Sequence, residues 1–359
     1  MESGGGRKRT GSGRGDAAVA CARRAAALVR ARKPEQVGAS GLERRVVLAT
    51  NRWYGTRGGA QGLAVGLRSV PGDKRAGKRA GGKTEVGLVV FVKRKKPRSK
   101  VAKGRLIADA VRTGGGVVPV RVVELVRCVP EAAVSVGAGT QTPGTVTLYL
   151  RDEAAGTLYG LSAAHVLAQS PLSGGRWRYG RPFDAVYRNV HGGATPTVCG
   201  RLVDRSVPDW DNIFPTDSVD AALYVLDDPG EAVRLNRPIG RAALGDVVRV
   251  IGATSGAGSA AGVVTAVDFG TERAMYPYAH PSGRLREVNL AGLCLAEYQS
   301  AGGDSGGLVV RERDGAAVGM HIGRLVVRTG EAGAMVESER RMFIPLERVL
   351  GRWAGLRVY

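Results

Sequence analysis

The sequence is poor in aromatic residues, and its apolar runs are short. Phe, Trp and Tyr together make up 5% of the 359 residues. No apolar run reaches the roughly 18 residues that a membrane-spanning helix needs, which excludes a membrane span of that kind. The basic, Gly-rich amino terminus lacks the apolar core and the cleavage site of a secretory signal, so we expect a cytoplasmic protein.

Cysteine is also scarce. The four cysteines are Cys21, Cys128, Cys199 and Cys294, and no two of them form a CxxC pair. Their spacing matches no zinc site, and four cysteines in a chain of this length do not make a disulfide framework. We therefore expect free thiols, and we expect neither a metal nor another cofactor.

Positive charge is present in excess, but only in one part of the chain. Residues 1–130 contain 30 Lys and Arg against 8 Asp and Glu, whereas residues 131–359 carry a net charge of −1. No lysine follows Lys103. Such a concentration of charge attracts polyanions, so we expect residues 1–130 to bind nucleic acid or another polyanion without sequence preference. A module for protein interaction or autoregulation remains the alternative, because no zinc finger, helix-turn-helix or RNA-binding aromatic motif is present.

Residue patterns divide the chain into three parts. Residues 1–44 form a basic tail with a helix from Asp16 to about residue 32, ended by Pro34. From residue 45 the pattern becomes β, and 45–130 is predicted to be a small basic α+β module. Its expected strands cover 62–68, 85–93 and 117–126, with a short helix around 106–111. From 131 to 359, short β-type runs separated by Gly, Pro, Asp and Asn predict a sandwich or barrel.

Three short strings in the last part indicate a common chemistry. They are LSAAHV (161–166), SVDAAL (218–223) and GGDSGG (302–307), which occur in the order His, Asp, Ser. In this order and spacing they resemble the signatures of the chymotrypsin/trypsin-like serine peptidases. The resemblance covers about residues 131–359 and implies a chymotrypsin-like double β-barrel, so that the whole chain is expected to be mainly β. The first 130 residues do not take part in it.

The resemblance assigns a role to each residue of these strings. Ser305 would be the nucleophile, His165 its general base, and Asp220 the group that holds the imidazole in one tautomer. The backbone N–H groups of Gly303 and Ser305 would form the oxyanion hole. Asp304 would help to shape that hole.

A fourth string, VGMHIG (318–323), concerns specificity. In the family this strand forms one wall of the pocket for the P1 side chain, the residue before the cleaved bond, and pairs with the substrate backbone. His321 followed by Gly323 resembles the glutamate-specific bacterial peptidases and the picornavirus processing proteases. There the His, with a hydroxyl residue at the position of Ser300, recognises an acidic or amide P1 side chain. Bacterial relatives of unknown specificity also carry such a His, so the preference for Glu or Gln stays open.

Other positions depart from the secreted trypsin-like enzymes. Gln299 lies where trypsin-type enzymes have an Asp, which argues against a preference for Arg or Lys. Val166 replaces the cysteine that usually follows the histidine, and no Ile-Val-Gly-Gly start occurs near residue 130. The disulfide-free bacterial members are the most similar in these respects. The segment 245–267 also resembles that group and predicts two strands joined by a Gly/Ser hairpin.

Together these observations predict a serine endopeptidase that hydrolyses proteins or peptides through an acyl-enzyme. The basic amino-terminal part would localise or regulate it. The alternative is a non-enzymatic protein that binds nucleic acid or protein and uses the protease fold as a scaffold. The complete set of His165, Asp220 and Ser305 argues against that alternative.

Overall fold

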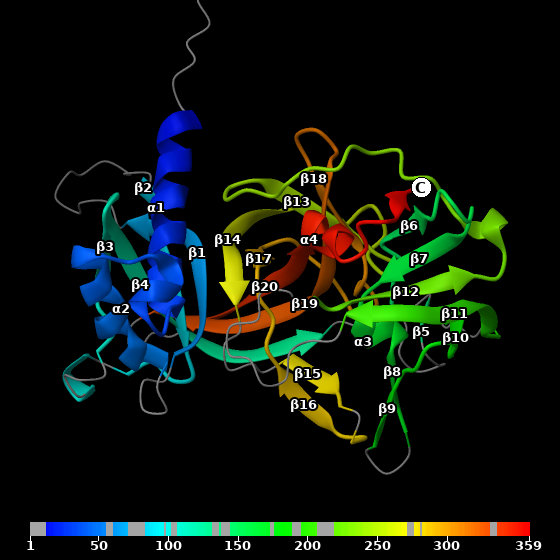
Figure 1. Cartoon of the computed structure of the whole chain (residues 1–359), viewed down its shortest axis with the longest axis horizontal. Helices are drawn as coiled ribbons and strands as arrows, with labels where there is room; N and C mark the ends of the chain where they lie inside the picture. Colours follow the sequence, from blue (N-terminus) through cyan, green and yellow to red (C-terminus); the bar gives the residue numbers. More distant parts are fainter. Residues whose placement is uncertain are drawn as a thin grey trace, which may run out of the picture.

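Strands dominate the chain, with helices mainly near the amino terminus (Figure 1). The computed structural model describes residues 12–54, 60–70, 83–96, 98–101, 106–130, 136–137, 144–172, 176–188, 195–206, 219–270, 276–280, 282–330 and 336–359. The α-helices are α1 (Ser12–Arg30), α2 (Gly41–Tyr54), α3 (Ala164–Leu167) and α4 (Leu346–Gly351), and the short 3₁₀ helices are η1 (Pro34–Val37), η3 (Arg98–Lys100) and η6 (Pro229–Glu231).

An antiparallel sheet of seven strands carries the first half of the predicted peptidase part. Its strand order is β21-β6-β7-β12-β11-β10-β5. The bounds are β5 (Val136–Gly137), β6 (Leu148–Arg151), β7 (Leu158–Ser162), β10 (Ala185–Arg188), β11 (Thr197–Ser206), β12 (Ala221–Leu226) and β21 (Arg357–Val358). Two separate hairpins project from the molecule, formed by β8 (Gln169–Pro171) with β9 (Trp177–Tyr179) and by β15 (Tyr276–Ala279) with β16 (Leu285–Val288).

The second sheet has ten strands, in the order β13-β18-β19-β20-β17-β14-β1-β2-β4-β3. Its bounds are β1 (Ala60–Val70), β2 (Lys83–Val92), β3 (Ala110–Thr113), β4 (Gly116–Pro130), β13 (Val247–Ile251), β14 (Gly262–Gly270), β17 (Leu293–Ala296), β18 (Leu308–Arg311), β19 (Ala317–Thr329) and β20 (Val336–Pro345). Because β13 also pairs with β14, and β19 also pairs with β4, the sheet closes twice. The two rings share β14, β17, β20 and β19.

The predicted fold class is confirmed. The chain is mainly β, with two strand assemblies over the peptidase part and a smaller α+β part before them. The predicted hairpin in 245–267 is present, since β13 pairs with β14 through Val247 opposite Val263. Most predicted strands agree with observed strands to within a few residues.

Two local predictions were wrong. Residues 41–54 form the helix α2 instead of the start of a β pattern. The adjacent β-branched Val46 and Val47 suggested a strand, but Val47, Thr50 and Trp53 recur at helical spacing and are buried. The helix expected around 106–111 is also absent, because Ala110–Thr113 pairs with β4 as an antiparallel hairpin.

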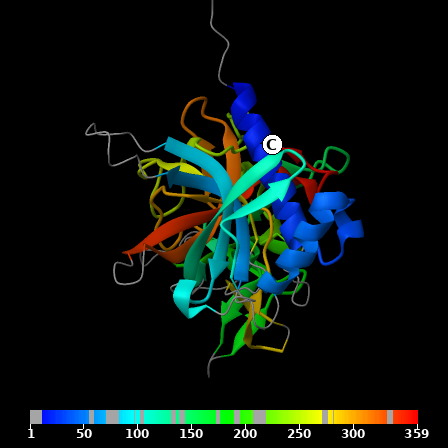
Figure 2. The same cartoon turned by 90° about the vertical axis from the view of Figure 1, so that its left-hand side faces the viewer.

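The amino-terminal strands β1, β2 and β4 are built into the second ring. Alternate residues point to opposite faces, as the strand period requires: Leu88 and Val90 lie in one hydrophobic core, and Val89 and Phe91 lie in the other. Helix α1 lies beside these strands (Figure 2), and its buried alanines belong to the same core as Leu88 and Val90. The sequence-based division at residue 130 remains a prediction about domains, but the sheet and both cores continue across it.

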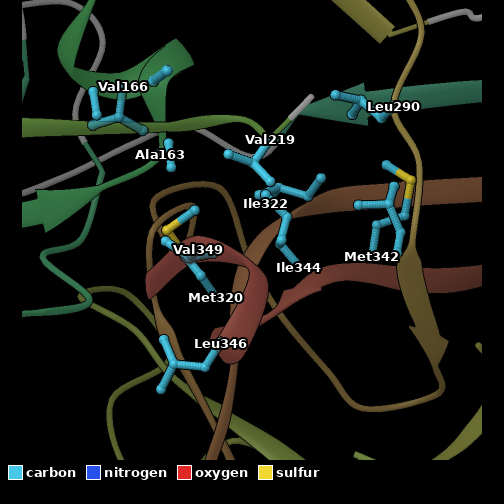
Figure 3. Close-up of a cluster of buried hydrophobic side chains, with 14 of the residues drawn as sticks. Ala163, Val166, Val219, Leu290, Met320, Ile322, Met342, Ile344, Leu346 and Val349 are labelled. Carbon is cyan, nitrogen blue, oxygen red and sulfur yellow. The ribbon is translucent and has the colours of Figure 1, made fainter. Parts of the chain in front are cut away.

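One hydrophobic core contains side chains from three of the four strings, those of His165, Asp220 and His321. Val166, Val219 and Ile322 are all fully or almost fully buried in it (Figure 3). They are direct sequence neighbours of His165, Asp220 and His321. Each of these polar residues is therefore fixed by an apolar neighbour that packs into the same core, which stiffens the site.

Candidate active site

His165 and Asp220 form a buried pair at the ends of two neighbouring strands. β7 leads directly into α3, which carries His165, and β12 follows directly after Asp220. The two strands pair with Ala222 opposite Ser162. His165 Nδ1 lies 2.5 Å from Asp220 Oδ2, and the His165 backbone N–H donates to Asp220 Oδ1 at 2.9 Å.

This geometry has a clear chemical consequence. The side chains of His165 and Asp220 are 1% and 0% exposed, so water does not compete for their hydrogen bond. With Nδ1 donating to the carboxylate, the neutral ring keeps its proton on Nδ1 and presents Nε2 as a base. The second bond, from the backbone of His165, fixes the carboxylate plane relative to the ring.

Ser305 lies in a turn whose backbone conformation favours glycine. Gly303 has a φ of 109° and Gly306 a φ of 87°, both in the region that L side chains rarely adopt. A Cβ at Gly306 would collide with Thr145 O and Ser162 Oγ. The second collision partner is three residues before His165, so the serine turn packs directly against the segment that carries the histidine.

The serine turn is also held by hydrogen bonds from both sides. Thr145 N donates to Ser305 O at 2.7 Å, and Thr145 Oγ1 donates to Gly303 O at 2.7 Å. On the other side, Gly306 N donates to His321 O at 2.8 Å. Within the described part of the chain, the amides of Gly303 and Ser305 donate no hydrogen bond. These are the two N–H groups predicted to form an oxyanion hole.

The Ser305 hydroxyl points to a backbone carbonyl. Ser305 Oγ donates to Ile322 O at 3.4 Å, a long hydrogen bond. Among the described residues, no hydrogen bond joins this hydroxyl to His165. Catalytic hydrogen bonds are often loose before substrate binds, and rotation about one side-chain torsion redirects a serine hydroxyl.

Asp304 organises the turn from inside. Its side chain is completely buried and accepts N–H groups of Ala301 at 2.8 Å, Thr254 at 3.1 Å and Ser255 at 3.0 Å, together with the Ser255 hydroxyl. A Cβ at Gly252 would collide with this carboxylate. Asp304 thus contacts the turn at 252–256 between β13 and β14, a contact that the sequence did not indicate. Its role in shaping an oxyanion hole remains a prediction.

Of the four residues predicted to set specificity, His321 and Gly323 lie in β19, and His321 is hydrogen-bonded to the serine turn. His321 is fully buried, and its Nδ1 lies 2.8 Å from Tyr298 Oη. Gly323 adopts a φ of 149°, again a conformation that favours glycine. Ser300 is half-buried and Gln299 is exposed; the Gln299 N–H donates to Ala260 O at 3.0 Å.

Sequence reasoning missed Tyr298 and Thr145. Tyr298 is one of the largest fully buried side chains and packs edge-on to His321, with ring centroids 5.6 Å apart. Its position directly before Gln299, in a chain with few aromatic residues, is the only local signal for it. Thr145 belongs to no signature string, and its role depends on contacts with residues more than 100 positions away.

A cavity of about 780 Å³ is lined by residues that include Thr145, Gly252, Ala253, Arg188 and Glu231. Arg188 and Glu231 form an ion pair. None of the predicted catalytic residues lines this cavity.

Within residues 1–130, where polyanion binding is predicted, a run of basic residues follows β2. Lys93, Arg94 and Lys96 are exposed, whereas Lys95 donates from its Nζ to Gly330 O at 2.9 Å. Lys95 N also donates to Glu124 Oε2 at 2.9 Å. Binding of nucleic acid by this segment remains a prediction.

In the part of the chain that the structure describes, no helix has the length and the apolar character needed to span a membrane. The His, Cys, Asp and Glu side chains described there form no group of three or more that could hold a metal ion. The four cysteines are free thiols.

Comparison with solved structures finds chymotrypsin-like serine proteases. Chymotrypsin from Cellulomonas bogoriensis is 16% identical, with a TM-score of 0.37 over 64% of this chain and 97% of that one. A glutamic-acid-specific serine protease, whose substrate binding uses a histidine triad, is 18% identical, with a TM-score of 0.36 over 64% and 99%. Protease A from Thermobifida fusca is 16% identical, with a TM-score of 0.36 over 63% and 96%. No family model and no curated protein matches the chain.

Proposed function

We propose that the chain is a serine endopeptidase with Ser305 as nucleophile, His165 as general base and Asp220 as the group that orients the base. The observation that carries this proposal is the buried His165–Asp220 pair, at 2.5 Å, beside a serine turn packed against the same segment. A buried carboxylate bonded to one nitrogen of an imidazole leaves the other nitrogen suited to accept a proton. A structural histidine would gain nothing from a neighbouring glycine-shaped serine turn.

The reaction follows from these roles. His165 Nε2 takes the proton of Ser305 as Ser305 Oγ attacks the carbonyl carbon of the bond to be cleaved. The N–H groups of Gly303 and Ser305 stabilise the negative charge on the tetrahedral oxygen. His165 then gives its proton to the leaving amine, and an acyl-enzyme remains. Water, deprotonated by His165, hydrolyses the ester and restores the serine.

The proposal includes a preference for Glu or Gln at P1. His321 would meet the P1 carboxylate or amide, with Ser300 as a second donor. With Tyr298 Oη donating to Nδ1 of His321, the neutral ring would carry its proton on Nε2, from where it can donate to an oxygen of the substrate. The exposed Gln299 supplies no negative charge for a basic P1 residue.

A fluorophosphonate probe tests the nucleophile. The wild-type protein should be labelled, and Ser305→Ala should lose both labelling and peptide hydrolysis, by about 10⁶-fold in rate. Ser282→Ala, which removes a serine in the distant β15–β16 hairpin, is the matched control and should be labelled normally. Wild-type protein that is folded but neither labelled nor active would favour the non-enzymatic scaffold instead.

A further inference from the structure

Residues of both strand assemblies line the cavity of about 780 Å³. Arg188 in β10 and Tyr224 in β12 belong to the seven-stranded sheet, whereas Ile251 in β13 and Leu308 in β18 belong to the ten-stranded sheet. The volume is within the range of roughly 300–1,000 Å³ that is typical of sites for small organic molecules. The cavity is therefore a candidate for a second site, beside the one that holds the proposed catalytic residues.

Two guanidinium groups and one carboxylate are among the described side chains that line this cavity. Arg188 forms an ion pair with Glu231 and donates from Nε to Thr197 Oγ1 at 3.1 Å, so its charge is already balanced. Arg237 is exposed and donates to Gly315 O at 3.4 Å, a long hydrogen bond. Within the part of the chain that the structure describes, no carboxylate pairs with Arg237. Its guanidinium can therefore bind an anion that enters the cavity.

The other ionisable groups of the lining are neutral near pH 7. Burial raises the pKa of the Cys199 thiol to about 11, and it also raises the pKa of the Tyr149 and Tyr224 phenols. Two positive charges from arginine and one negative charge from Glu231 therefore leave the lining with a net charge of +1. A monoanion balances this charge, whereas a dianion would bring excess negative charge close to Glu231.

Apolar side chains line the same cavity. Val146 and Ile251 are half-buried and Leu308 is buried, and the half-buried ring of Tyr149 adds further apolar surface. Such a lining favours a ligand with an apolar body, because the removal of apolar surface from water is favourable. The unpaired guanidinium favours a planar carboxylate as the charged group, since the two can form parallel hydrogen bonds.

We propose that this cavity binds a small organic monocarboxylate with an apolar body. The carboxylate would accept hydrogen bonds from the Arg237 guanidinium, and the body would pack against Val146, Ile251 and Leu308. This binding does not depend on the proposed peptidase activity, because none of the three proposed catalytic residues lines the cavity.

Two residues that line the cavity also hold the serine turn. Thr145 Oγ1 donates to Gly303 O at 2.7 Å, and Thr145 N donates to Ser305 O at 2.7 Å. Thr147 Oγ1 donates to Gly306 O at 2.6 Å. A ligand that packs against Thr145 and Thr147 would restrain the backbone on both sides of Ser305. It would thereby also restrain the N–H groups proposed to form the oxyanion hole.

A bound carboxylate should therefore make Ser305 more reactive. N–H groups that are fixed in advance stabilise the oxyanion without having to reorganise during the reaction. We expect fluorophosphonate labelling to be about fivefold faster with the ligand bound, at the lower end of typical coupling between two sites. This consequence rests on the proposed function, whereas the binding itself does not.

The probe is 4-phenylbutanoate, which joins one carboxylate to an apolar ring. Neutral 4-phenylbutanamide and dianionic 3-phenylpropyl phosphate have a similar shape and a different charge at pH 8. In calorimetric titrations of the full-length protein, the acid should bind about tenfold more tightly than either relative, because only the acid gives Arg237 a matching monoanion. Arg237→Gln should lower the affinity for the acid to that for the amide. Arg234→Gln is the matched control and should not change it, since Arg234 stacks on Tyr359 and does not line the cavity.

A second pair of variants fills space instead of removing charge. Ala253 lines the cavity and is exposed, so Ala253→Trp would fill part of it without replacing a buried side chain. Ala257 is exposed in the same connection between β13 and β14, but it does not line the cavity. Ala253→Trp should weaken binding of 4-phenylbutanoate about tenfold, because the ligand loses apolar contacts, whereas Ala257→Trp should not weaken it. Circular dichroism spectra like that of the wild type show that the variants fold.

Each other outcome has a distinct meaning. Wild-type protein that does not bind 4-phenylbutanoate, or binds the acid and the amide equally well, overturns the proposed site. Binding that survives both Arg237→Gln and Ala253→Trp places the ligand elsewhere and overturns the site as well. Binding at the cavity with an unchanged labelling rate overturns only the coupling to Ser305. Wild-type protein that binds the acid but is never labelled overturns the proposed function and leaves the carboxylate site standing.

Discussion

The Asp304 carboxylate accepts the backbone N–H of Thr254, a residue of the turn that joins β13 to β14. Asp304, the residue before Ser305, is thus held by a turn of the same ten-stranded sheet. With Ala301 and Ser255 as further donors, the buried charge is satisfied by fixed N–H groups.

Asp304→Asn should therefore disturb the turn more than its small size change suggests. In the variant, an amide NH₂ would replace one of the two carboxylate oxygens. It would face either the N–H of Ala301 or the N–H groups of Thr254 and Ser255, and these donors would lose their acceptor. We expect a loss of about 2–3 kcal/mol in the free energy of unfolding, the range of a hydrogen bond to a buried charge. Fluorophosphonate labelling should slow at least tenfold. Urea unfolding and labelling rates test this, with Asp227→Asn at an exposed position as control.

Tyr298 should control the P1 preference through His321. Tyr298→Phe removes the hydroxyl 2.8 Å from His321 Nδ1 while keeping the buried ring. The ratio of kcat/KM for Glu over Ala at P1 should fall about tenfold, and His321→Ala should lower it by about 10²-fold. Tyr159→Phe, in the other sheet, should leave the ratio unchanged. An unaltered ratio in both His321→Ala and Tyr298→Phe would remove His321 from the specificity pocket.

The parts that the sequence could predict are those encoded locally. The three signature strings each fix a strand end or a turn, and the structure brings all three to one region. Helix α2 was missed because Val46 and Val47 favour strands, whereas burial at helical spacing decided the local structure. The pairing of β4 with β19 joins residues about 200 positions apart, and no local pattern in either strand specifies its partner. The contacts of Asp304 with Thr254 and of Tyr298 with His321 also join residues far apart in the sequence, so no local pattern predicts them.

Burial should protect three of the four thiols. Burial raises the pKa of the Cys199 thiol to about 11, and it raises the pKa of Cys294 further. The reactive thiolate is therefore scarce at pH 8. In native protein, iodoacetamide should modify Cys21, which is partly exposed, and leave Cys128, Cys199 and Cys294 unmodified. Peptide mass mapping before and after unfolding measures this, and rapid modification of Cys199 in native protein would contradict it.

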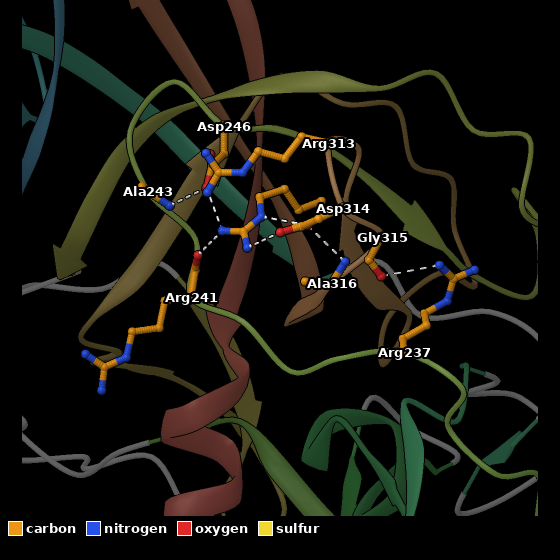
Figure 4. A network of polar contacts seen from close by, with 9 residues as sticks. Arg237, Arg241, Ala243, Asp246, Arg313, Asp314, Gly315 and Ala316 are labelled. Carbon is orange, nitrogen blue, oxygen red and sulfur yellow. Dashed lines mark hydrogen bonds and ion pairs between the residues drawn. The ribbon is translucent and has the colours of Figure 1, made fainter. Parts of the chain in front are cut away.

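Arg311, the last residue of β18, forms a polar network with Arg241, Asp246 and Asp314, and Figure 4 shows these three partners close together. The Arg311 side chain is 11% exposed and donates to Asp314 through two nitrogens, at 3.0 Å and 2.7 Å. It also contacts the buried Asp246 at 3.3 Å. The hydrogen bond from Arg311 lowers the pKa of Asp314 from 3.8 to about 2.

Asp314 should therefore stabilise the fold above pH 4 and lose this effect in acid. Its pKa is lower in the folded state, so the stabilisation is complete above the unfolded pKa and disappears as the pH falls from about 4 to about 2. The difference in urea midpoint between wild type and Asp314→Asn should be largest at pH 5 and should shrink over that window. Since Asp314 is an exposed partner, we expect a small difference. A gap that widens in acid would be the wrong sign.

Asp220→Asn should disturb the orientation and tautomer of the His165 ring while leaving the ring itself in place. The asparagine fits the same buried space, but its amide changes which His165 nitrogen carries the proton. In a serine protease triad this exchange lowers kcat by about 10⁴-fold, and we expect a similar loss here with little change in KM. Asp228→Asn, which alters an exposed cap of η6, is the matched control and should keep normal activity. If Asp220→Asn hydrolyses peptides as fast as wild type, Asp220 does not orient His165, and another residue must take that role.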